Sequence, residues 1–537
     1  MAQINSCIVI IQGGEVISGK LPAIGREQRT ETEEASVVGQ PPETLVELVP
    51  SVLDTELEEG TTWGIGPFRI AFSLRSFLPG PNSSLRRFSI AEAALLLMMA
   101  YIASRGLGVV RQSMFNAFFG TGPEANAFYA ASRLPDTLFN LIAGGALTQA
   151  FVPVFVSYEQ DYGQREAWRL ASLVFNVMLV ALTAVALVAE FVTPTFVTHL
   201  LVPGYPPAEQ ELTTTLTRIM LVQPLLLGLG TIVTAILSSK RQFLLPAVSI
   251  AVYNFGMIGG LLVSLAFPRV GIYGPTYGTL AAAACQVLVQ VPALVKQGVR
   301  YTWLWNLKHP GLRRVMHLLI PGTLGVCISS IALIIDTAFI SYFPDSASLS
   351  AIHNANMLFA FPVALFAQAI GQAALPKMSM QAANGSYTRL RMTILKVTGS
   401  ALILCLPTAV LLCLLGGPVI RIIFQHGAFD AHSSELTFLA LIGYAVGLPG
   451  TTIGWLLING FYSLKDAWTP LLTNILALVI HILLILLLLH LMTGLLLVLA
   501  IPLGAAIASI AEAIVLAVLL FRRLKKRAEG GTTGLRP

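Results

Sequence analysis

Three arginines and two aspartates lie inside long apolar segments of the 537-residue chain, where an unpaired charge is costly. Arg105 and Arg111 stand six residues apart with no acid beside them, and two glycines between them weaken any helix they occupy. A guanidinium group binds phosphate oxygens in a bidentate manner, so this pair predicts an anion site. The alternative is that Arg111 extends to a membrane surface while Arg105 bonds backbone carbonyls.

A second charged pair follows in the next apolar segment. Arg133 and Asp136 are three residues apart, which places them on one face of a helix that Pro135 can kink. They either neutralise each other or contact a substrate, and both interpretations stay open. Asn126 and Asn140 extend the same polar stripe. We predict Asn126, Arg133 and Asp136 as substrate-binding residues, together with the first two arginines.

The second half of the chain holds one isolated acid, Asp336, followed by two asparagines. Asp336 is surrounded by apolar residues, so it needs a proton or a partner. It either binds a coupling cation or pairs with Arg105 or Arg133. Asn356 is a further candidate for the cavity or for coupling, although Asn354 and Asn356 also have the character of residues that join membrane helices by hydrogen bonds.

Motifs for enzymatic or metal chemistry are missing from the sequence. The eight histidines show no metal-ligand spacing, and His481 and His490 are expected to bond backbone groups. The five cysteines show no paired spacing. No nucleotide-binding loop or nucleophile elbow appears. We therefore expect no metal and no cofactor, and any transport would draw on a coupling cation, the membrane potential or the substrate gradient.

The composition identifies the elements that must position these residues. The chain is 55% hydrophobic and 11% charged, whereas soluble domains carry roughly a quarter charged residues. This balance excludes a soluble enzyme, a nucleic-acid-binding protein and a disordered scaffold. From residue 88 onward, runs of about 20 apolar residues recur, each long enough to cross a membrane. We expect an all-α polytopic membrane protein.

Twelve such runs define the predicted transmembrane helices. They cover Ile90–Phe119, Asn126–Val156, Ala167–Val192, Leu212–Leu237, Leu244–Phe267, Tyr277–Val295, Val315–Phe343, Leu349–Leu375, Leu395–Leu415, Leu436–Tyr462, Pro470–Leu491 and Leu495–Phe521. Alternate loops together hold 21 lysines and arginines, whereas the opposite loops hold few. Because Lys and Arg are enriched on the cytoplasmic side, both termini are predicted to be cytoplasmic.

A weak internal repeat divides the spans into two sets of six. The residues QAFVP at 149–153 recur as QAALP at 372–376, an offset of 223. The order Ser, Lys, Pro at 239–246 recurs at 463–470, an offset of 224. Six is an even number, so both halves start on the same side of the membrane. This predicts a parallel repeat with a substrate cavity between the halves.

Four segments follow from this division. Residues 1–87 hold 11 of the 27 acids and lack a sustained period, so we expect a mostly disordered cytoplasmic extension. Within it, Trp63–Leu78 mixes aromatics with arginines and is also compatible with a membrane-surface segment. We place the N-terminal six-helix lobe at 88–300, the C-terminal lobe at 301–527 and a tail at 528–537.

Several short motifs resemble those of a known family. They are RGLGVVR at 105–111, FG at 119–120, RLP at 133–135, FQHGAF at 424–429 and GFYS at 460–463. Together they are similar to signatures of the MurJ (MviN) lipid II flippases, a branch of the multidrug/oligosaccharidyl-lipid/polysaccharide exporter superfamily. The resemblance covers residues 88–527. Four acids of the family pattern are replaced, by Gln112, Asn126, Gly144 and Asn356, and a family arginine is replaced by Phe139.

The resemblance implies a V-shaped, MATE-like carrier that works by alternating access. It implies a cargo of undecaprenyl-pyrophosphate-linked peptidoglycan precursor, lipid II, moved to the outer leaflet of the bacterial cytoplasmic membrane. Arg105 and Arg111 would bind the pyrophosphate, with help from Arg133. We accordingly predict a transporter and not an enzyme, acting as a monomer among membrane lipids with no nucleic-acid partner.

Three other functions stay open at this point. The first is export of another polyprenyl-linked glycan or of a cationic drug, for which Asp136 and Asp336 would be the acids. The second is a polyprenyl-phosphate transferase, which would need clustered acids or histidines near one membrane face. The third is a non-transporting scaffold, suggested by the replaced family charges.

Overall fold

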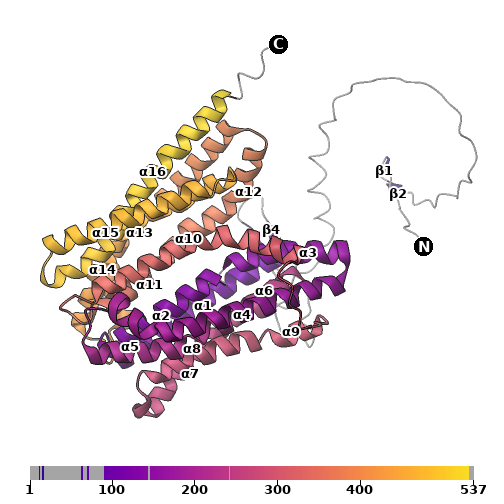
Figure 1. Ribbon diagram of the computed structural model, residues 1–537. Helices are drawn as coiled ribbons and strands as arrows, with labels where there is room; N and C mark the ends of the chain where they lie inside the picture. Colours follow the sequence, from indigo (N-terminus) through magenta and orange to yellow (C-terminus); the bar gives the residue numbers. More distant parts are fainter. Residues whose placement is uncertain are drawn as a thin grey trace, which may run out of the picture. The chain divides into compact units, whose positions relative to one another are not determined.

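The computed structural model describes residues 90–142, 145–240 and 242–530, and four short strands that precede them (Figure 1). The chain divides into two compact units, Met1–Pro79 and Gly80–Pro537. In the first unit, β1 (Ile11–Gln12) pairs antiparallel with β2 (Glu15–Val16), and β3 (Thr62–Gly64) with β4 (Arg69–Ala71). The rest of the predicted extension, and residues 531–537 of the predicted tail, lie outside the described residues.

The second unit is helical. Its first half contains α1 (Ile90–Phe119), α2 (Pro123–Ile142), α3 (Gly145–Tyr162), α4 (Gln164–Phe196), η4 (Val197–Leu201), α5 (Pro207–Met220), α6 (Gln223–Ser239), α7 (Leu244–Ala266), η5 (Pro268–Val270), α8 (Tyr273–Leu288) and α9 (Val291–Lys296). Its second half contains α10 (Pro310–Ile340), α11 (Ser348–Val363), η6 (Ala364–Ala369), α12 (Ile370–Ala383), α13 (Tyr387–Phe424), α14 (Ala431–Ser463), α15 (Trp468–Leu491), η7 (Gly494–Leu499) and α16 (Ala500–Gly530).

The helices have the length and composition of membrane spans. Within the described residues, ten helical segments are long and apolar enough to cross a membrane. The two remaining predicted runs correspond to α1 and α10, which are 30 and 31 residues long. At 1.5 Å per residue, each is longer than a hydrocarbon core of about 30 Å. The prediction of an all-α polytopic membrane protein is confirmed.

Two spans that the sequence predicts as continuous helices are broken. The predicted span Leu212–Leu237 consists of α5 and α6, and the predicted span Tyr277–Val295 consists of α8 and α9. Pro224 lies in the first turn of α6 and Pro292 in the first turn of α9. A proline is accommodated in the first turn, where its missing N–H has no helical partner, but it disrupts a helix interior.

The two halves repeat one packing scheme. In the first half, α1 packs on α7, α2 on α5, and both α6 and α7 on α8. In the second half, α10 packs on α15, α11 on α14, and both α14 and α15 on α16. Corresponding helices therefore contact corresponding neighbours, which confirms the predicted six-plus-six repeat.

Helix α10 connects the halves. Although it opens the second half, its first turns pack into the core of the first half, where Leu312, Val315 and Leu319 join a cluster with residues of α3, α4 and α6. The segment before α10 is also held there, because the Tyr301 hydroxyl donates to Asn176 Oδ1 of α4 over 2.8 Å. Near its other end, Asp336 bonds His481 of α15 and Thr337 accepts a hydrogen bond from Arg133 of α2.

Candidate functional site

A cavity of about 140 Å³ lies among α1, α2, α5, α6, α7, α8 and α11. We call it the arginine cavity, because Arg111 is the basic residue in its lining. Asp136, Gln112, Gln223 and His353 contribute further polar groups, and aromatic and aliphatic side chains fill the rest of the wall. Six of the seven helices belong to the first half, and α11 belongs to the second. The cavity therefore lies where the halves meet.

Arg111 is held in this cavity by α7. Its Nη1 donates to Asn254 Oδ1 over 3.4 Å and contacts Met257 Sδ at 3.1 Å. Asn254 in turn donates to Ser104 Oγ of α1 over 3.0 Å. No ion pair involves Arg111 within the described residues. A guanidinium has five N–H donors, so this geometry orients the group and leaves donors for an anion.

The other two predicted arginines lie outside the arginine cavity. Arg105 is exposed, and its guanidinium carbon lies 5.9 Å from the centre of the Phe361 ring of α11. Arg133 donates from Nε to Thr337 Oγ1 over 3.3 Å, which joins α2 to α10. No Arg133–Asp136 ion pair occurs within the described residues, although the two charges still interact, so both interpretations of this pair stay open. Arg111 and Asp136 line the arginine cavity, and the other two arginines do not.

Asp336 pairs with a histidine and not with Arg105 or Arg133, the partners that the sequence suggested. Its Oδ1 lies 2.7 Å from His481 Nε2, which joins α10 to α15. His481 therefore bonds a carboxylate of another span, which the sequence analysis did not predict. His490 does bond a backbone carbonyl, that of Leu486, over 3.0 Å.

The repeat relates this ion pair to the arginine cavity. An offset of 224 takes Gln112 to Asp336 and Met257 to His481. Gln112 follows Arg111 on α1, and Met257 contacts Arg111 from α7. Two positions beside Arg111 in the first half thus correspond to the two positions that form the Asp336–His481 pair in the second half. The offset is a sequence signal by which the Asp336–His481 pair could have been found.

The predicted asparagines lie at helix contacts. Asn126 is buried; its Oδ1 accepts from the Ser350 backbone N–H over 3.0 Å and from Ser350 Oγ over 2.6 Å, and its amide donates to the Ser346 carbonyl. Asn356 is exposed and lies within hydrogen-bonding reach of Tyr444 of α14. Neither lines the arginine cavity. Their roles in substrate binding and coupling stay predictions.

A buried amide network beside the cavity was not predicted as a site. Gln112 Nε2 donates to Asn354 Oδ1 over 2.8 Å and to the Tyr129 hydroxyl over 2.5 Å. Asn116 Nδ2 donates to the same Asn354 oxygen over 3.1 Å. The network joins α1 and α2 to α11 across the two halves. An uncharged residue at 112 suits this environment, since a lone carboxylate would be costly to bury there.

Two glycines form a close backbone contact between the halves, which we call the glycine contact. Gly120, after α1, and Gly427, before α14, both have a φ of +59°. The Ala428 backbone N–H donates to the Ala117 carbonyl over 2.8 Å. A Cβ on Gly120 would lie 2.5 Å from the Ala428 carbonyl oxygen, and a Cβ on Gly427 would collide with the Ala117 carbonyl. Two family-like motifs of the sequence thus meet here.

Further bonds surround the glycine contact. Thr121 Oγ1 lies 2.7 Å from Ser433 Oγ, and Ser113 Oγ donates to the Ile423 carbonyl over 2.5 Å. Asp430 caps α14 by accepting from the Ser433 backbone N–H over 2.8 Å, and the bonds from Ser433 lower the pKa of Asp430 below its usual range. These ties gather at one end of the helices, opposite the loops rich in Lys and Arg.

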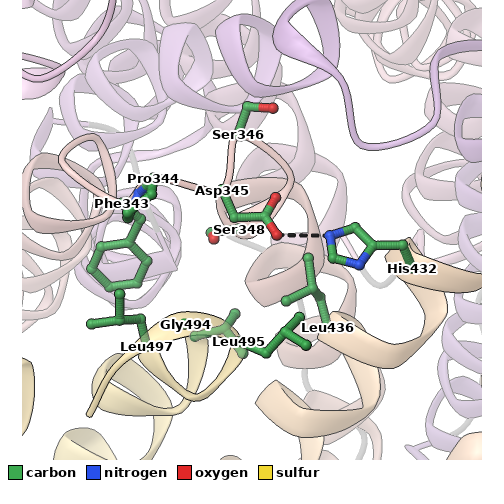
Figure 2. A pocket seen from close by; sticks show the side chains of 11 residues that line it. Phe343, Pro344, Asp345, Ser346, Ser348, His432, Leu436, Gly494, Leu495 and Leu497 are labelled. Atoms are coloured by element: carbon green, nitrogen blue, oxygen red, sulfur yellow. Dashed lines mark hydrogen bonds and ion pairs between the residues drawn. The ribbon is translucent and has the colours of Figure 1, made fainter.

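A larger cavity of about 430 Å³ opens at this same end of the second half (Figure 2). Figure 2 shows Asp345 and His432 pointing toward each other across it, with Asp345 Oδ2 2.7 Å from His432 Nε2. Leucines of η7 and Phe343 form the apolar side. No predicted site residue lies in it. The Asp345–His432 bond ties the loop before α11 to the start of α14.

The helix lengths and the repeated packing scheme define a multi-span membrane protein built from two six-helix halves. A solved structure of the lipid II flippase MurJ in an inward closed conformation superimposes with a TM-score of 0.68 at 24% identity, covering 81% of this chain and 90% of that chain. An inward-facing MATE multidrug transporter gives a TM-score of 0.68 at 14% identity, covering 81% and 99%. These likenesses establish the fold.

The sequence comparisons identify the family. The family model described as lipid II flippase MurJ matches residues 115–534. A Burkholderia cenocepacia protein named lipid II flippase MurJ is 30% identical over 397 residues, which cover 72% of this chain and 76% of the relative. A probable lipid II flippase MurJ of Rhizobium meliloti is 27% identical over 378 residues, covering 70% of each. The chain belongs to the MurJ family of lipid II flippases.

Proposed function

We propose that this chain moves lipid II from the inner to the outer leaflet of a bacterial cytoplasmic membrane by alternating access, as a monomer and without enzymatic chemistry. The observation that carries the proposal is the family match over residues 115–534, to proteins named for this activity. The arginine cavity supports it chemically. A pyrophosphate bears charges that hydrocarbon excludes, and the guanidinium of Arg111 in the cavity wall would compensate them.

Arg111 is the residue best placed to bind the pyrophosphate. It is oriented by Asn254 and has no acidic partner within the described residues. Asp136, in the same lining, can accept hydrogen bonds from the sugar or peptide part of the cargo. Arg105 and Arg133 would join Arg111 only after the halves move, because Arg105 contacts Phe361 and Arg133 bonds Thr337 across that boundary.

The size of the arginine cavity supports a mechanism in which the halves separate. Its volume of about 140 Å³ is below the roughly 300–1,000 Å³ of pockets that enclose drug-sized ligands. A phosphate group fits this space, whereas a lipid-linked glycan does not. The cargo therefore binds to a more open arrangement, and the polyprenyl tail remains in the surrounding lipid.

In this proposal the glycine contact is a gate, which must open before the cargo can leave the cavity. Helix ends of both halves meet there, at the end of the bundle that carries few basic residues. With both termini cytoplasmic, this end faces outward, so the described arrangement is closed on the outside. Breaking the bonds around Gly120 and Gly427 would open the cavity to the outer leaflet.

Coupling to an ion runs, in this proposal, through the Asp336–His481 pair. The His481 imidazole already bonds the Asp336 carboxylate, which is the group that a coupling cation would otherwise bind. Proton binding or release at the pair changes the attraction between α10 and α15, and α10 also packs against the first half. Transport would then respond to the proton gradient as well as to the membrane potential.

Complementation tests the proposed activity. The full-length chain is expressed in a bacterium depleted of its own lipid II flippase, with membrane insertion verified by immunodetection. Restored growth and cell shape are the expected result. Failure of a well-inserted protein, together with rescue by an established flippase in parallel, would contradict lipid II as the cargo.

A further inference from the structure

A groove lies between α15 and α16, at the end of the bundle where α16 carries its basic residues. We call it the α15–α16 groove. Its volume is about 600 Å³. The lining consists of Phe461, Thr469, Leu472, Thr473, Leu476, Val515, Leu519, Arg522, Arg523 and Lys526. It shares no residue with the arginine cavity, the glycine contact or the Asp336–His481 pair.

The lining forms two rows of side chains, one on α15 and one on α16. Each row is polar at one end and apolar at the other. On α16, Val515, Leu519, Arg522 and Lys526 follow one another at helical spacing, so the stripe changes from aliphatic to basic toward the C-terminus. On α15, the hydroxyl of Thr469 precedes leucines at 472 and 476. The groove thus has a polar mouth and an apolar floor. This arrangement matches an amphiphile, which has a polar head and an apolar tail.

Two exposed aromatic side chains mark the depth of the mouth. Trp468, the first residue of α15, is 70% exposed, and Tyr462, at the end of α14, is 49% exposed. Trp and Tyr concentrate at the level of lipid headgroups. The mouth therefore lies at a membrane interface, and the leucines below it lie at the depth of acyl chains. Leu472 and Leu476 are themselves 62% and 44% exposed, as expected for a surface covered by lipid.

The mouth has a surplus of positive charge. Arg523 pairs with Asp466, whose carboxyl is also bonded by Thr469. Although burial raises it, these bonds and the Arg523 charge lower the pKa of Asp466, so the acid is ionised and neutralises one base. Arg522 and Lys526 are exposed and form no ion pair within the described residues. Two cations therefore remain for a ligand.

We propose that the α15–α16 groove binds an anionic phospholipid of the adjacent leaflet. Arg522 and Lys526 bind the headgroup phosphate, and one acyl chain lies along Leu472, Leu476 and Leu519. A free phosphate would leave the apolar floor uncovered, and a zwitterionic lipid would leave the two cations uncompensated. The inference is independent of the proposed cargo, since it concerns another surface and its test measures lipid binding alone.

Lipid binding to the purified full-length protein tests this inference. Delipidated protein in detergent is titrated with dioleoylphosphatidylglycerol, dioleoylphosphatidylcholine or inorganic phosphate, and bound lipid is counted by native mass spectrometry. We expect one retained phosphatidylglycerol and weaker phosphatidylcholine binding. The double variant R522Q/K526Q should lose phosphatidylglycerol affinity on the order of 25-fold, since each base near an anionic lipid surface contributes about 1 kcal/mol, or about fivefold. The control R313Q/R314Q removes two exposed bases outside the groove and should retain affinity.

A second variant tests the floor without changing charge. Leu476→Trp fills the groove below the mouth and should also weaken phosphatidylglycerol binding, with no effect on inorganic phosphate. Equal loss in the R313Q/R314Q control, equal binding of the two lipids, or full binding by L476W would each overturn the proposal. Displacement of phosphatidylglycerol by undecaprenyl pyrophosphate at lower concentration would overturn it as well, by assigning the groove to the tail of a lipid-linked cargo.

Discussion

The carboxylate of Asp336 and the imidazole of His481 lie 2.7 Å apart and join α10 to α15. Their side chains are 15% and 7% exposed, so both are withdrawn from water. The equivalent helices of the first half, α1 and α7, meet instead around Arg111. In the first half the Arg111 guanidinium therefore remains available to a ligand. In the second half Asp336 and His481 bond each other.

The first prediction concerns the stability contributed by this pair. Removing one partner leaves the other buried and uncompensated, which costs about 3–5 kcal/mol. We expect His481→Ala and Asp336→Ala each to lower the thermal unfolding temperature in detergent strongly, and the double variant H481A/D336A to recover part of the loss. Additive losses in the double variant would show that the two side chains do not interact.

The second prediction concerns substrate binding by Arg111. Arg111→Ala should reduce flipping at least tenfold, and Arg111→Lys should retain part of the activity, because an ammonium keeps the charge but not the bidentate geometry. The matched control is Arg218→Ala. Arg218 pairs with Glu190 over 3.2 Å and lies outside the arginine cavity. Equal activity of R111A and R218A, at equal membrane levels, would remove Arg111 from the site.

The third prediction tests the glycine contact. Gly120→Ala adds a Cβ that would meet the Ala428 carbonyl oxygen, so it should hold the halves apart and reduce flipping. Gly385→Ala is the control: Gly385 follows α12 as Gly120 follows α1 and also has a positive φ, +66°, but a Cβ there meets nothing within 4 Å. A side chain at a positive φ costs about 1–2 kcal/mol in either variant. If they behave alike, strain and not the contact explains the effect.

The fourth prediction is a pH dependence at the same end of the molecule. Bonds from Ser433 lower the folded-state pKa of Asp430 below its unfolded value of about 3.9. The cap therefore stabilises the protein fully above that value and is lost as the pH falls through the folded-state pKa. Asp430→Ala should cost about 1 kcal/mol at pH 7, and the difference from the unmodified chain should shrink below about pH 4.

Ser386→Ala provides the control for this cap. Ser386 also precedes a helix, α13, but its side chain makes no capping hydrogen bond. It should change the unfolding temperature little at any pH. A difference between D430A and the unmodified chain that persists below the folded-state pKa would contradict the assignment of the effect to the carboxylate.

The fold could be predicted from local patterns. Apolar runs of membrane length indicated the spans, and two short sequence matches at offsets of 223 and 224 indicated the repeat. The breaks before Pro224 and Pro292 were missed, because a proline inside an apolar run does not show whether the helix kinks or restarts.

The site was harder to predict because it depends on which spans meet. Asp336 could be recognised as needing a partner, but His481 lies 145 residues away on a helix that only the packing brings close. Asn126 and Asn354 have the same residue type, yet one bonds Ser350 and the other Gln112 of α1. The residue type at a single position does not reveal which partner the side chain will bond. The 224-residue offset gave the one usable signal, since it relates the α10–α15 contact to the α1–α7 contact.

The most direct test of the central claim is lipid II accessibility at the outer leaflet in flippase-depleted cells. Cells that express this chain, its R111A variant or an empty vector are labelled with a membrane-impermeant lipid II reagent. We expect outer-leaflet lipid II with the unmodified chain and a loss of labelling of at least tenfold with R111A. Equal labelling in cells with the inserted chain and with the empty vector would contradict the claim that this protein moves lipid II.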